Sequence, residues 1–209
     1  ALGLEAASRG AADVLLIEST YGNRVPPAEA LELELLAVLK RVLARKGVVV
    51  IPAFAVGGAQ MLLHVITQLQ ETGQLARVPV YLNSPMAASV SGLYRTFPRL
   101  HRLDAHALAA MERNVHVVDS VEASKALNRR KGPMIIVSAS GMATGGRVLH
   151  HLLAFATEPR NAIVLCGFQA GGTRGAALAA GQKQLRIFGQ EVPVGAEVVQ
   201  LAAGSAHAD

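Results

Sequence analysis

The feature that most constrains the fold is the alternation of short apolar runs with helical patterns along the sequence. Short runs rich in Val, Ile and Leu predict buried strands, whereas apolar residues at helical spacing predict helices. Strands separated by helices favour an α/β domain with a mostly parallel sheet and helices on both faces. The predicted strands are 14–18, 48–54, 78–83, 115–119, 134–138, 162–168, 184–188, 191–194 and 197–201, and the predicted helices are 29–46, 57–70, 86–97, 104–112, 121–128, 147–156 and 173–180.

Composition sets outer limits on what the protein does. About half of its 209 residues are apolar, enough to bury a large core, but no apolar run approaches the roughly 20 residues of a membrane span. We see no secretory signal pattern. The single cysteine, Cys166, lies in an apolar run and excludes a disulfide framework, so we expect a cytoplasmic setting. A formal charge of +5 permits a polyanionic partner without establishing one.

Polar residues gather in four turns that follow predicted strands, at residues 18–24, 83–87, 138–147 and 167–173. Ligands of parallel α/β sheets bind at such turns. The turn at 138–147 is the richest, because its glycines let backbone N–H groups approach an anion before a predicted helix. It fits neither the Walker loop nor the dinucleotide fingerprint, and a purely structural tight turn explains the pattern equally well. The candidate phosphate-binding residues are Ser138, Ser140, Gly141, Thr144, Gly145, Gly146 and Arg147.

The seven histidines lack the spacing of a zinc site, with no His-x-His pair and no His-Glu-x-x-His. His150 and His151 are adjacent on a predicted helix and therefore point to different faces. We predict no metal ligands in this chain. His207 differs from the rest, because it lies in Ser-Ala-His-Ala-Asp just after the last predicted strand.

These turns, in this order, resemble the β-CASP branch of the metallo-β-lactamase superfamily, which includes RNA-processing nucleases. The matching stretches are 12–22, 51–57, 81–87, 138–147, 167–173 and 205–209, and they cover nearly the whole chain. The resemblance implies catalytic roles for Glu18, in Glu-Ser-Thr-Tyr-Gly, and for His207. We expect the two side chains to approach each other, so that the Glu18 carboxylate orients an imidazole facing the scissile phosphate.

The resemblance also implies hydrolysis of RNA by a water held between two zinc ions, whose ligands lie outside this sequence. It divides the chain into a junction strand of the metallo-β-lactamase domain at 1–23, the β-CASP domain at 24–190, and strands returning to the metallo-β-lactamase domain at 191–209. By itself such a fragment is expected to be inactive. The expected partners are RNA and the metallo-β-lactamase domain of the same chain, with no membrane, and a homodimer is left open.

Two departures from the family pattern support an alternative. The family usually has an arginine and an acid where this chain has Gly58 and Met61, and a large apolar residue where it has Gly204. A non-catalytic nucleic-acid-binding member of the same fold is therefore the second interpretation. A third, an unrelated nucleotide-binding α/β domain, is favoured only if the glycine-rich turn is considered alone.

Overall fold

The computed structural model describes residues 13, 14, 16 and 30–201. Its helices are α1 (Ala30–Ala44), α2 (Gly58–Glu71), α3 (Pro85–Thr96), the short 3-10 helix η1 (Pro98–Leu100), α4 (Ala105–Asn114), α5 (Val121–Leu127), α6 (Val148–Phe155) and α7 (Arg174–Ala179). Its strands are β1 (Val48–Pro52), β2 (Val80–Leu82), β3 (Val115–Val117), β4 (Met134–Ser138), β5 (Ala162–Cys166), β6 (Gln184–Ile187), β7 (Gln190–Pro193) and β8 (Glu197–Leu201). No helix in this part of the chain is both long and apolar enough to span a membrane.

The strand predicted at 14–18 falls mostly outside the described residues. Val14 and Leu16 are described, and both lie outside regular secondary structure with 80% and 94% of their surfaces exposed. At these two positions the prediction of a buried strand is wrong. Glu18 lies outside the described residues, so nothing tests the proposed role of its carboxylate.

Six strands form one sheet in the order β3-β2-β4-β1-β5-β8, and every neighbouring pair is parallel. β1 and β4 pair along their whole length, from Val48 opposite Met134 to Pro52 opposite Ser138. β6 and β7 form a separate antiparallel hairpin. The predicted parallel α/β architecture is thus confirmed. β8 is the edge strand beside β5 in this sheet, and the assignment of 191–209 to an adjoining domain stays a prediction.

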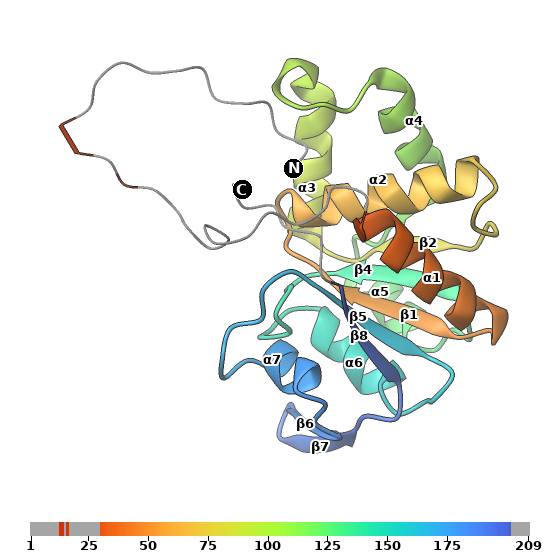
Figure 1. Cartoon of the computed structure of the whole chain (residues 1–209), viewed down its shortest axis with the longest axis vertical. Coiled ribbons are helices and arrows are strands. Elements are labelled where there is room, and N and C mark those ends of the chain that lie inside the picture. The colour runs from red at the N-terminus through yellow and green to blue at the C-terminus, as the bar shows by residue number, and fades with distance from the viewer. Residues whose placement is uncertain (1–12, 15, 17–29, 202–209) are drawn as a thin grey trace.

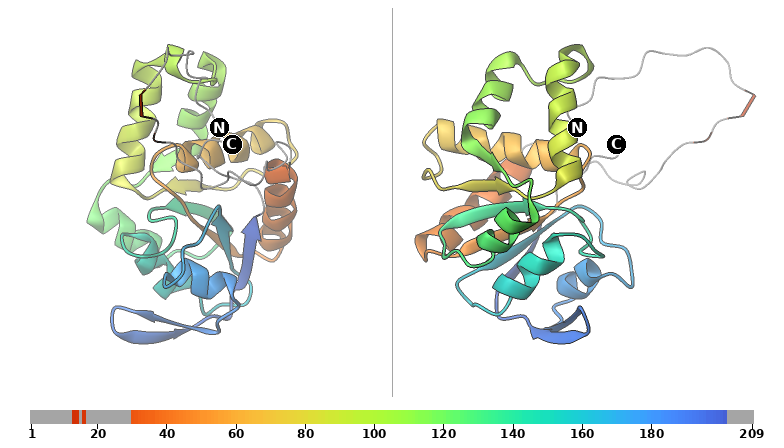
Figure 2. Two further views of the ribbon diagram at one scale, coloured as in Figure 1. Left: turned by 60° about the vertical axis from the view of Figure 1, so that its left-hand side comes forward. Right: turned by 180° about the vertical axis from the view of Figure 1, so that it is seen from behind.

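Two apolar cores lie on opposite faces of the sheet, because successive strand residues point to opposite sides. Val49 and Ile51 pack with α1 and α2, whereas Val48 and Val50 pack with α6. Figures 1 and 2 show α1 and α2 on one face of the sheet and α5, α6 and α7 on the other. Burial on both faces explains why the central strands read as continuous apolar runs rather than as alternating ones.

The chain leaves the neighbouring strands β1 and β4 toward opposite faces of the sheet. β1 is followed by α2, which packs on one face, and its neighbour β4 is followed by α6, which packs on the other. Where helices leave adjacent strands for opposite faces, the carboxyl ends of those strands border a crevice in which α/β proteins bind ligands. The chain after β4 is the glycine-rich turn, and the chain after β1 begins with Ala53 and Phe54.

Candidate phosphate site at the carboxyl edge of the sheet

The turns after β1 and β4 touch each other. A Cβ atom on Gly141 would lie 2.8 Å from the ring of Phe54 and 3.0 Å from its backbone nitrogen, so only glycine fits there. Gly146 has a φ of 75°, which glycine adopts without strain. Gly145 has neither constraint, because a Cβ there would meet no atom within 4 Å. Packing therefore explains two of the glycines, whereas Gly145 faces open space.

The backbone of this turn points its carbonyl groups inward. The carbonyl oxygens of residues 139–144 accept hydrogen bonds of 2.9–3.3 Å from Val148 N, Ala143 N, Gln169 Nε2, Gly175 N and Arg174 Nη1. Within the described residues, the N–H groups of Gly145, Gly146 and Arg147 have no protein acceptor. Three adjacent N–H groups without an acceptor are suited to binding an anion, and these three lie directly before α6.

A buried polar network centred on Asn83 holds the glycine-rich turn against the sheet. Asn83 is fully buried and lies just after β2, the other neighbour of β4. Its Oδ1 accepts a 2.8 Å hydrogen bond from Arg147, and its Nδ2 donates to Ser124 Oγ at 2.8 Å and contacts His151 Nε2 at 2.7 Å. Its backbone carbonyl accepts a 2.8 Å hydrogen bond from Ser138. One side chain thus joins β2, the turn and α6.

His151 is held in one neutral form by this network. Because Arg147 donates to the Asn83 oxygen, the Asn83 amide nitrogen faces the imidazole and donates to Nε2. Nδ1 then carries the proton and donates to Asn128 Oδ1 at 2.5 Å. Burial, together with the nearby charges of His150 and Arg147, lowers the pKa of His151 to about 4. A protonated His151 would have no acceptor at Nε2.

His151 should make the stability of the protein depend on pH. Its pKa is about 4 in the folded chain and near 6.5 when unfolded, so between these values the unfolded chain binds the extra proton. Stability is therefore complete above about pH 6.5 and falls as the pH drops, by about 2 kcal/mol between pH 7 and pH 5. Denaturant unfolding of His151→Gln across this range should show a flatter pH profile than the parent chain. His106→Gln, at an exposed position, should keep the parent's slope.

His64 should also make the stability of the protein fall as the pH drops. Partial burial also lowers the pKa of His64, so some slope should remain in His151→Gln. If His151→Gln and His106→Gln give identical profiles, then His151 is not the buried neutral histidine that the network requires.

Positive charge remains beside the turn. Arg147 bonds to Asn83 Oδ1 and to the carbonyls of Val118 and Asp119, at 2.8–2.9 Å. Arg174 bonds to the carbonyls of residues 143, 144 and 186. In the described structure neither guanidinium has a carboxylate partner, so neither charge is neutralised. Both therefore contribute positive potential where the free N–H groups lie.

The structure shows where several predicted site residues direct their polar groups. The hydroxyl of Ser138 is buried and its proton goes to the Asn83 carbonyl, and the guanidinium of Arg147 is used within the protein. Ser140 and Thr144 hydroxyls bond to each other at 3.0 Å and remain near the surface. The sequence interpretation missed His151 and Arg174. Arg174 comes directly after the fourth polar turn, at 167–173, and this position could have identified it from the sequence. His207 lies outside the described residues.

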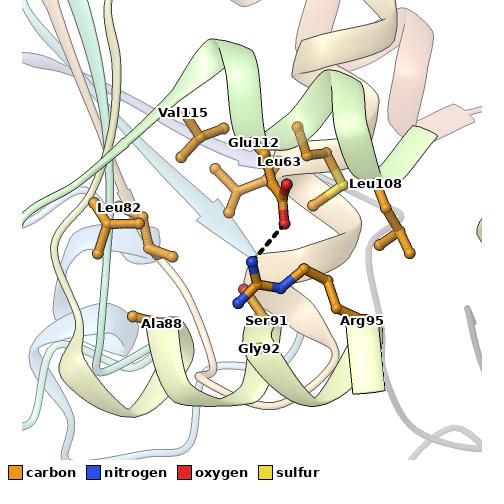
Figure 3. Close-up of a pocket in the computed structure, with 11 residues that line it drawn as sticks. Leu63, Leu82, Ala88, Ser91, Gly92, Arg95, Leu108, Glu112 and Val115 are labelled. Atoms are coloured by element: carbon orange, nitrogen blue, oxygen red, sulfur yellow. Dashed lines mark ion pairs between the residues drawn. The ribbon is translucent and has the colours of Figure 1, made fainter. Parts of the chain in front are cut away.

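Two other features do not add a reactive centre. The thiol of Cys166 is buried, which raises its pKa to about 12 and agrees with the predicted buried cysteine. A cavity of about 380 Å³ lies between α3, α4 and the β2–β3 edge of the sheet. Figure 3 shows its apolar lining and the 3.0 Å ion pair between Arg95 and Glu112. None of its lining residues comes from the glycine-rich turn.

Among the residues that the structure describes, no three or more His, Cys, Asp or Glu side chains are grouped so that they could hold a metal ion. This part of the chain therefore does not fit a two-zinc centre. At the carboxyl ends of β1 and β4 it instead has free N–H groups at residues 145–147 under positive potential, and these suit a phosphate group.

Comparison with known proteins identifies the family of the chain. The Beta-Casp domain model matches residues 59–178. The chain is 43% identical over 208 residues to Ribonuclease TTHA0252 of Thermus thermophilus, and 34% identical over 201 residues to an RNase J-like protein of Methanocaldococcus jannaschii. It is 32% identical over 212 residues to the Transcription termination factor FttA of Methanosarcina mazei.

Each of these alignments covers 94% of this chain, but only 47%, 47% and 33% of the respective relative. The chain thus spans at most about half the length of these curated relatives. The model match extends from the start of α2 into α7 and includes the glycine-rich turn and Asn83. The chain belongs to the Beta-Casp domain family, in the β-CASP branch of the metallo-β-lactamase superfamily.

Proposed function

We propose that this chain is the RNA-binding cap of a zinc-dependent ribonuclease, and that its glycine-rich turn holds a backbone phosphate of the RNA. The observation that carries the proposal is the set of three unpaired N–H groups at Gly145, Gly146 and Arg147, beside an open position at Gly145. The names of two relatives, a ribonuclease and an RNase J-like protein, support RNA as the substrate class.

The chain's own contribution is to bind and orient. The Asn83 network keeps the turn rigid, so that its N–H groups are aligned before the phosphate arrives and little ordering entropy is lost on binding. Contacts to phosphate position a strand without reading its bases. We propose that Glu18 and His207 act on that strand, and that zinc is held by residues beyond those described here, in the metallo-β-lactamase part of the same protein. Zinc would supply the activated water.

Gly145→Val should weaken RNA binding without harming the fold. The backbone of Gly145 is not in the left-handed region and its side-chain position is open, so valine fits. Its methyl groups would occupy the space in front of the free N–H groups. We expect affinity to fall by about 1–3 kcal/mol, and by a similar amount for RNAs of different sequence. Fluorescence anisotropy with two unrelated single-stranded RNAs measures the effect.

Gly92→Val is the matched control, because position 92 also has no atom within 4 Å but lies on α3, away from the turn. This variant should bind RNA like the parent chain. If Gly145→Val binds normally, or loses affinity for one sequence only, then the turn is structural and the phosphate site lies elsewhere.

A second function, a non-catalytic nucleic-acid-binding protein, rests on Gly58 and Met61. Both residues lie in the first turn of α2, at the same edge of the sheet as the glycine-rich turn, and neither supplies a charge there. The two functions are distinguished by single-turnover RNA cleavage, measured on a longer protein that joins this chain to the proposed zinc-binding domain. Cleavage that is lost on chelating the metal supports the enzyme, whereas tight RNA binding without cleavage supports the alternative.

A further inference from the structure

The opposite edge of the sheet carries an unpaired basic surface. The loops that lead into β1, β2, β4 and β5 contain Arg45, Lys46, Arg77, Arg129, Arg130, Lys131 and Arg160, against the single acid Glu158. Three of these arginines are neutralised: Arg45 by Glu197, Arg77 by Glu71 and Arg160 by Glu158. In the described part of the chain, the other four residues form no ion pair. We call Lys46, Arg129, Arg130 and Lys131 the amino-edge cluster.

The fold brings this cluster together from two loops. Gly132 lies against the loop before β1, where a Cβ on Gly132 would be 2.7 Å from the carbonyl oxygens of Lys46 and Gly47. The basic run of residues 129–131 and Lys46 therefore share one edge. All four side chains belong to exposed residues. Like charges gathered without acids raise the free energy of the bare surface and favour a polyanion.

An open hollow lies next to the cluster. It measures about 380 Å³ and is lined by Pro79, Tyr81, Arg130, Lys131, Pro133 and Met134. Arg130 is positioned in advance, since it donates to the Tyr81 hydroxyl and its guanidinium carbon lies 5.5 Å from the Tyr81 ring centroid. The imidazole of the exposed His116 lies beside the same ring, with 5.4 Å between centroids. Tyr81 is buried, so its ring fixes Arg130 in place, and the exposed imidazole of His116 is the ring here on which a base could stack.

We propose that the amino-edge cluster is a second contact site for the RNA phosphate backbone, separate from the glycine-rich turn. The inference rests on the proposed function in taking RNA as the polyanion. The two sites lie at opposite ends of β4, whose five residues span about 16 Å at ~3.3 Å each. One phosphate cannot occupy both sites. The cluster therefore adds affinity for long or folded RNA and leaves short RNA unaffected.

The test removes three charges at once, in Arg129→Gln/Arg130→Gln/Lys131→Gln. The matched control is Lys40→Gln/Arg99→Gln/Lys183→Gln, which removes the same charge from exposed positions elsewhere. Binding of one long single-stranded RNA is measured against salt concentration. The cluster variant should lower the slope of log affinity against log salt by about 2, and weaken binding about tenfold at low salt. The control variant should stay within about twofold of the parent.

Three results would overturn the proposal. The first is an equal loss in the cluster and control variants, which would show a general charge effect. The second is an equal loss for short and long RNA. The third is a cluster variant that binds RNA normally but no longer binds a polyglutamate peptide or phosphatidylglycerol vesicles, which would assign the surface to an acidic protein or a membrane.

Failure of this inference can be told apart from failure of the proposed function. In the longer protein, the cluster variant should cleave a short RNA at the parent's rate, whereas Gly145→Val should not bind it well. If Gly145→Val binds normally while the cluster variant loses affinity for long RNA, then the amino edge is an RNA site and the glycine-rich turn is not. If the cluster variant binds long RNA like the parent, the amino-edge site is refuted whatever Gly145→Val does.

Discussion

In the proposed full-length ribonuclease, His207→Ala should lower the turnover number by about 10²–10⁴-fold, the usual contribution of a general acid or base. The expectation follows from the family position of His207 in Ser-Ala-His-Ala-Asp, where the imidazole would face the scissile phosphate and Glu18 would favour its protonated form. RNA affinity should change much less, because in the proposed function the glycine-rich turn, not His207, holds the RNA strand. Single-turnover rates and dissociation constants, measured on the same RNA, separate the two effects.

Two further variants sharpen this test. His207→Gln keeps a hydrogen-bond donor without a titratable ring, so it should recover part of the rate if the imidazole only donates a hydrogen bond. It should match His207→Ala if the ring transfers a proton. His106→Gln, on α4 and exposed, should leave turnover unchanged. An unaltered turnover number in His207→Ala would remove His207 from the mechanism.

Asn83→Ala should destabilise the chain by about 3–4 kcal/mol, more than an ordinary surface substitution. The change removes the acceptor of Arg147 and the donor to His151 together, and it leaves Ser124 without its partner. Each buried polar group that loses its partner costs about 1–3 kcal/mol. Urea unfolding with a fluorescent or circular dichroism readout measures the loss. RNA affinity should fall as well, because the glycine-rich turn loses the hydrogen bond between Arg147 and Asn83.

Asn114→Ala is the matched control, since the Asn114 side chain also has three partners, Arg77, Glu71 and the Ala110 carbonyl, but near the surface, and the change should cost less than about 1 kcal/mol. Asn83→Asp gives a second readout that a purely steric role would not change. A carboxylate at this position can accept from Arg147 but cannot donate to His151, so the pKa of His151 should rise. NMR titration of the His151 ring follows that shift. Equal stabilities of Asn83→Ala and Asn114→Ala would contradict the network.

Local patterns were sufficient to predict most of the secondary structure. The run at 134–138 became β4 with the predicted bounds, and the pattern at 121–128 became α5. Helix starts follow from short-range chemistry, as where Ser84 accepts from Ala87 N and Thr173 from Ala176 N. Hydrophobicity alone misled at Val14 and Leu16, which are exposed in the described structure. An apolar run predicts a strand only where another surface covers it.

The sequence by itself determined the fold class, the position of the glycine-rich turn at the end of a strand, and the family, because periodicity and motif order are properties of neighbouring residues. Only the tertiary structure decided which polar groups are free. Asn83 and His151 are distant in sequence and meet because β2 and β4 are neighbours in the sheet. The same packing turns Ser138 and Arg147 inward and leaves the N–H groups of residues 145–147 without an acceptor among the described residues. A hydrogen bond needs atoms within about 3 Å, and no local pattern specifies which distant side chain supplies them.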